Sequence, residues 1–185
     1  MCRPASLCIF VAAACIASFA HVAHAEATLR YGFGRPASAA EIAGWDLDVR
    51  PDGTGLPEGH GSVAEGQAIY DAKCASCHGT FGESTDYMAI AGGVGSLASD
   101  SPMRTTGSKL NYATTLFDYI RRAMPFQQPE SLTNDEVYAL TAFLLAKNGI
   151  IRERDEMNAR TLAKVRMPNR EGFILAYPPR AVPTP

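Results

Sequence analysis

The sequence has few of the residues that build metal clusters or disulfide frameworks. It contains five cysteines, four histidines and one tryptophan in 185 residues, and its formal net charge is only −2. Three of the cysteines and two of the histidines lie within the first 25 residues, so that Cys74, Cys77, His60 and His78 remain beyond them. Two cysteines cannot form a disulfide framework. The near-neutral charge gives no indication of a nucleic-acid partner.

The first 25 residues have the pattern of a secretory signal. Arg3 precedes an alanine-rich apolar run from about residue 7 to residue 20, and Ala23-His24-Ala25 forms a small-x-small cleavage site. The run is short for a membrane span, and an uncleaved anchor is the alternative. We therefore predict cleavage before Glu26, a periplasmic protein, and no stable membrane span after cleavage.

The sequence Cys74-Ala-Ser-Cys77-His78 has the spacing of a c-type haem attachment motif. Two cysteines three positions apart on a helix share one face, so both thiols can add to the vinyl groups of one porphyrin while the next imidazole reaches the iron. A structural zinc site would need four ligands, and a thioredoxin-like pair would need a βαβ context. We predict one covalently attached haem c with His78 as its proximal ligand.

A methionine is the candidate for the opposite side of the haem. The segment 112–122 carries apolar residues at helical spacing and ends at Ala123-Met124-Pro125, 47 residues after Cys77. With so few histidines, a bis-histidine haem is disfavoured, and a thioether next to a proline suits the distal position. We predict Met124 as the sixth ligand. Met88 and Met103 are its rivals in a glycine-rich loop expected to pass under the proximal side, and core packing of Met124 is the other alternative.

Two capping boxes predict the main helices. The sequence Ser62-Val-Ala-Glu65 opens a helix that runs to the haem motif, and residues 133–136 open another that ends near Gly149. Residues 62–149 resemble class I cytochromes c. This resemblance implies an all-α fold in which the two helices cross, with Gly66 permitting close approach and Tyr70 filling the contact.

Both flanks of this domain are predicted to be irregular arms, residues 26–61 and residues 150–185. The first arm is rich in turn formers, with a short helix possible between Ser38 and Trp45, and it either wraps the haem domain or embraces another subunit. The second carries 7 Lys and Arg against 4 Asp and Glu, whereas residues 26–149 carry 9 against 15. Its prolines argue against any regular element, and its apolar residues favour packing against the haem domain or a partner.

Several longer stretches resemble the cytochrome subunit of the sulfane dehydrogenase of the bacterial thiosulfate-oxidising (Sox) system. They are Gly34-Arg-Pro36, residues 45–53, residues 112–126 and residues 165–173. The resemblance implies that the protein accepts electrons from a molybdenum-cofactor subunit that oxidises sulfane or sulfite, and passes them to a downstream cytochrome or oxidase. On its own it would not be an enzyme.

The resemblance leaves two other functions open, a free soluble carrier to a terminal oxidase and a haem enzyme or gas sensor with a labile sixth ligand. Some members of this family carry a second haem domain, whereas this sequence has one attachment motif. Members commonly have a proline whose carbonyl accepts a hydrogen bond from the proximal imidazole. Met88 stands at that place here, and its carbonyl is expected to accept the bond from His78.

Overall fold

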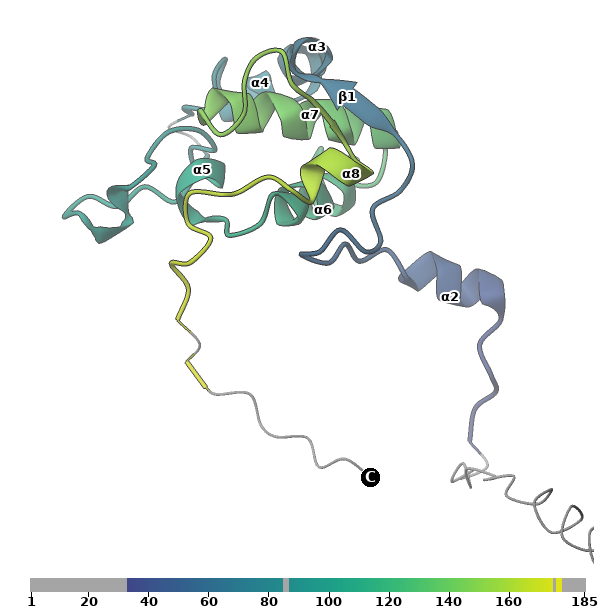
Figure 1. Cartoon of the computed structure of the whole chain (residues 1–185). Helices are drawn as coiled ribbons and strands as arrows, with labels where there is room; N and C mark the ends of the chain where they lie inside the picture. Colours follow the sequence, from purple (N-terminus) through teal and green to yellow (C-terminus); the bar gives the residue numbers. More distant parts are fainter. Residues whose placement is uncertain (1–32, 85–86, 175, 178–185) are drawn as a thin grey trace, which may run out of the picture. The chain divides into compact units, whose positions relative to one another are not determined.

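The computed structural model of the chain describes residues 33–84, 87–174 and 176–177, and its described part is mostly helical, as predicted (Figure 1). The elements are α2 (Ala39–Trp45), β1 (His60–Ser62), α3 (Val63–Lys73), α4 (Ala75–His78), the 3-10 helix η1 (Ser96–Ala98), α5 (Thr106–Lys109), α6 (Ala113–Ala123), α7 (Asn134–Lys147), β2 (Glu156–Asn158) and α8 (Ala159–Leu162). The predicted signal at residues 1–25 lies outside the described residues. No helix in the described ranges has the length and apolar character needed to cross a membrane.

The chain divides into two units, Met1–Ser38 and Ala39–Pro185. In the first unit the structure describes residues 33–38, which are exposed and form neither helix nor strand. All the helices and strands named above belong to the second unit.

Helix α7 lies at the centre of the second unit, where it packs against α3, α6, β1 and β2 (Figure 1). It begins at the predicted capping box, in which the Thr133 hydroxyl accepts from the Glu136 amide and the Glu136 carboxylate accepts from the Thr133 amide. Its residues from Val137 to Leu145 are all buried. A helix covered on every side has no polar face, which is why its sequence lacks a one-sided apolar pattern.

The predicted crossing of α3 and α7 is confirmed, and it is close enough for backbone to meet backbone. A Cβ atom placed on Gly66 would lie 1.9 Å from the carbonyl oxygen of Ala139, and one placed on Gly61 would lie 2.2 Å from the amide nitrogen of Ala139. Beside this contact the rings of Tyr70 and Phe143 pack with their centroids 4.8 Å apart. Only glycine leaves room for α7 at these two positions.

We expect Gly66→Ala to destabilise the fold, although alanine is normally the better helix former by about 1 kcal/mol. The added methyl group meets a backbone oxygen that cannot rotate away, so the helices must separate at a cost of about 1–3 kcal/mol or more. Urea unfolding of the haem-loaded protein would measure the change. The exposed neighbour Gln67 offers a control, because Gln67→Ala on the outer face should change the free energy of unfolding little. Equal stability of wild type and Gly66→Ala would contradict the close crossing.

The C-terminal segment contains regular structure, contrary to the prediction from its prolines. Strand β2 pairs antiparallel with β1, with Met157 opposite Gly61, and α8 follows directly. Met157, Leu162 and Met167 are buried in the core. The expectation was wrong because the prolines all stand at position 168 or later, so residues up to 167 are free to form a strand, a helical turn and a packed end.

The N-terminal segment is bound to the body from about Asp48 onward. Val49 and Leu56 pack against the core. The Tyr138 hydroxyl donates to the carbonyl of Pro57 at 2.8 Å, and the amide of His60 donates to the Asp135 carboxylate at 2.8 Å. This part of the arm wraps the domain. The short helix expected after Ser38 is present as α2, and none of its residues is buried.

Candidate functional site

The residues of the predicted attachment motif form one helical turn at the end of α3. Cys74 caps α3 and begins α4, and its carbonyl accepts from the amides of Cys77 and His78 at 3.1 and 3.0 Å. The Tyr70 hydroxyl donates to the carbonyl of Gly79 at 2.8 Å, which ties the end of the turn back to α3. The helical turn expected from the spacing of the two cysteines is therefore present.

Burial sets the protonation of two groups in this turn. It raises the pKa of the Cys74 thiol to about 11, so this side chain is a neutral thiol at pH 7. It lowers the pKa of His78, which favours the neutral imidazole, the form that binds metals. The Nδ1 atom of His78 is buried and has no hydrogen-bond partner in the described structure.

The hydrogen bond expected between His78 and the carbonyl of Met88 is absent, as that unpaired Nδ1 atom requires. The side chains of Tyr87 and Met88 are exposed, and the Tyr87 ring lies 6.3 Å from the His78 ring. The loop is instead held at Ile90. The amide of Ile90 donates to the carbonyl of Gly82 at 2.8 Å, and the carbonyl of Ile90 accepts from the Asn148 side chain at 3.3 Å, so these contacts hold the loop two residues after Met88.

Met124 lies where α6 ends. Its backbone is extended, with φ −124° and ψ 148°, because the following Pro125 disfavours helical geometry at the residue before it. The Met124 amide still donates to the carbonyl of Ile120 at 3.1 Å, which fixes its position on the last turn. Its half-buried side chain packs against the same core that Cys74 contacts.

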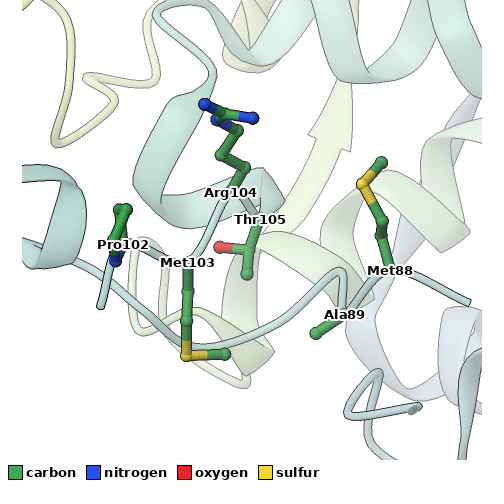
Figure 2. Close-up of a pocket in the computed structure, with 6 residues that line it drawn as sticks. All are labelled: Met88, Ala89, Pro102, Met103, Arg104 and Thr105. Atoms are coloured by element: carbon green, nitrogen blue, oxygen red, sulfur yellow. The ribbon is translucent and has the colours of Figure 1, made fainter. Parts of the chain in front are cut away.

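The two rival methionines line an open pocket of about 340 Å³ that Met124 does not line (Figure 2). Its lining residues are Met88, Ala89, Pro102, Met103, Arg104 and Thr105. Met88 is 79% exposed and Met103 44% exposed, so both thioethers are more accessible than that of Met124. No sequence pattern predicts this pocket, since both stretches that line it are irregular and lack apolar periodicity.

The residues present fit a c-type haem. Cys74 and Cys77 are free thiols, and His78 offers a half-buried, neutral imidazole on the same turn. The following segment carries exposed large apolar side chains against which a porphyrin could pack, namely Phe81, Tyr87, Met88, Val94, Leu97 and Met103. Within the described ranges, no group of three or more His, Cys, Asp and Glu side chains is arranged to hold a metal ion. Two thiols and an imidazole on one helical turn are the side chains that a thioether-linked haem requires.

Comparison with known proteins places the chain among the cytochromes. Residues 61–144 match the family described as cytochrome c oxidase, cbb3-type, subunit III. No curated protein matches the chain. Among solved structures, a chain of the sulfane dehydrogenase SoxCD from Paracoccus pantotrophus matches with a TM-score of 0.74 and 44% identity, covering 78% of this chain and 71% of that one.

This level of identity, over most of both chains, reflects common descent as well as a common fold. The family implies a haem c and electron transfer without catalysis by this chain alone. The protein therefore belongs to the class I c-type cytochromes and is a homologue of the matched chain of SoxCD.

Proposed function

We propose that this electron-transfer cytochrome is a periplasmic monohaem protein that accepts electrons from a molybdenum-cofactor subunit oxidising a sulfur compound, sulfane or sulfite. The observation that carries the proposal is the extent of the match to SoxCD. That match covers about 144 residues of this chain, whereas the cytochrome family match covers 84. About 60 matched residues therefore lie outside the general cytochrome domain. Because the match extends beyond the cytochrome domain, it supports a similar assembly with a donor subunit as well as a similar cofactor.

The roles of the site residues follow from their chemistry. Cys74 and Cys77 would hold the haem through two thioether links, His78 would bind the iron on the proximal side, and Met124 on the distal side. When bound, the haem supplies a one-electron iron couple whose potential a methionine ligand raises. If His78 and Met124 both bind the iron, no coordination position would be left open for a substrate. This favours electron transfer over a haem enzyme or gas sensor.

Export is supported by the signal-like first 25 residues, because c-type haem is attached outside the cytoplasmic membrane in bacteria. After reduction, the electron would pass to a downstream cytochrome or oxidase. A free electron carrier could also reduce that downstream acceptor. The step that distinguishes the proposal is therefore the reduction of the haem by the molybdenum subunit.

The proposal predicts that reduction of the haem requires both the donor protein and its substrate. Oxidised full-length holocytochrome would be mixed without oxygen with a purified molybdenum-cofactor sulfur dehydrogenase, and thiosulfate, sulfite or a sulfane-bearing protein would be added in turn. Stopped-flow absorbance would follow the reduced haem. We expect rapid reduction with one of the sulfur compounds, and no reduction when either the molybdenum protein or the sulfur compound is left out. Reduction of the haem without the molybdenum protein would contradict the proposal. So would the absence of reduction with every sulfur compound tested.

A further inference from the structure

Helix α2 is formed but buries nothing. Ile42 and Trp45 are 55% and 88% exposed, and no residue of Ala39–Trp45 is buried. The two side chains are three positions apart and so share one face of the helix. Single exposed apolar residues are ordinary on protein surfaces. Here, however, the only tryptophan of the chain stands beside an isoleucine on one side of a short helix. This is the pattern of a helix that inserts into a groove.

A short length of chain ties α2 to the end of α6. Asp48 lies 3.4 Å from Arg122 in an ion pair, and the amide of Val49 donates to Asp118 at 3.3 Å. Trp45 is three residues before Asp48, which allows at most about 11 Å of extended chain. Arg122 is itself two residues before Met124. A protein that binds α2 is consequently kept near the helix end that carries the proposed distal ligand.

The flanking segments are the part of the chain that a cytochrome domain by itself does not explain. About 60 of the residues shared with the SoxCD chain fall outside residues 61–144. In the N-terminal flank, residues from Asp48 onward are accounted for by their contacts with α6 and α7. In that flank, α2 is therefore the helix whose side chains are not buried against the domain.

We propose that α2 is the docking helix for the electron-donor protein, with Ile42 and Trp45 inserting into an apolar groove on that protein. This inference rests on the proposed function and names the surface through which it operates. Tryptophan in a desolvated pocket is among the side chains that contribute most to association. Binding through α2 would hold the donor beside the end of α6 without involving the haem ligands themselves.

The test compares full-length holocytochrome with an Ile42→Ser/Trp45→Ser variant and with Ala40→Gln, whose side chain lies on the opposite face of α2. Binding to the donor protein would be measured by sedimentation or by interferometry. We expect the double variant to bind about 30-fold more weakly or worse, and Ala40→Gln to bind within about twofold of wild type. The absorption spectrum and the rate of haem reduction by ascorbate should be unchanged in both, because α2 buries nothing.

Each other outcome overturns the inference in a distinguishable way. Equal binding by the double variant, with wild type still reduced by donor and substrate, removes α2 from the interface and leaves the proposed function standing. A variant that binds the donor normally but loses a dimer formed by wild type would assign α2 to contact between two copies of this chain. An altered haem spectrum would assign it to support of the haem domain. If wild type neither binds the donor nor is reduced by it, the proposed function fails too.

Discussion

Changing both cysteines, Cys74→Ala and Cys77→Ala, should yield a protein from which acid–acetone extraction removes all haem, and which does not fold stably. The extraction result follows because no thioether link remains. The loss of folding follows from binding linkage. A ligand at about 1,000 times its Kd stabilises the folded state by about 4 kcal/mol, and a covalently attached group acts as though more concentrated still. A domain near the lower end of the ordinary range of about 5–15 kcal/mol has little stability left after such a loss.

Single variants provide the control for this experiment. Cys74→Ala and Cys77→Ala should each retain one link and therefore some haem after extraction. Circular dichroism and limited proteolysis would report the folded fraction. Of the three variants, the double variant should be the one that the protease cuts within α3 and α7. Haem that survives extraction from the double variant would contradict attachment at this motif. A fully folded double variant would contradict the stabilising role of the haem.

Met124→Ala should leave the haem attached but abolish the weak near-infrared band of the iron–sulfur bond and lower the reduction potential. Axial ligands set haem potentials over a range of about 0.8 V, and methionine ligation lies toward its upper part. We therefore expect a large fall in potential. Stability should fall as well, because the half-buried side chain also packs against the core.

The chain offers two matched controls for this variant, Met88→Ala and Met103→Ala. Both side chains are thioethers in the open pocket beside Arg104, and their removal should leave the near-infrared band in place. Potentiometric titration and near-infrared spectra of the three variants would be compared. If the band persists in Met124→Ala and disappears in one of the others, the distal ligand is in the pocket and Met124 is only a core residue.

Sequence reasoning succeeded here where a local pattern reports a local structure. The capping boxes at Ser62 and Thr133 each place a hydroxyl and a carboxylate three positions apart, and both helices begin there. The role of Gly66 could be predicted from the resemblance to class I cytochromes c, which implies that the two helices cross at that point. The motif itself is contiguous, so its helical turn could be predicted without knowledge of the fold.

It failed where structure depends on segments distant in the chain. Strands β1 and β2 have three residues each, too few to show an alternating pattern. The burial of Met157 follows from its pairing with Gly61, which no local feature announces. The missing bond between His78 and Met88 has a similar cause. The course of residues 87–105 is set by contacts with Asn148 and Gly82, and an irregular segment carries no periodic signal of such contacts.

The pairing of β1 with β2 also fixes the order in which the molecule can be completed. A chain is made from its N-terminus, and Met157 is synthesised 79 residues after His78. Until then Gly61 has no partner strand, and the core lacks the side chains of Met157, Leu162 and Met167. The two thiols and the imidazole therefore exist in an unfinished domain before it closes.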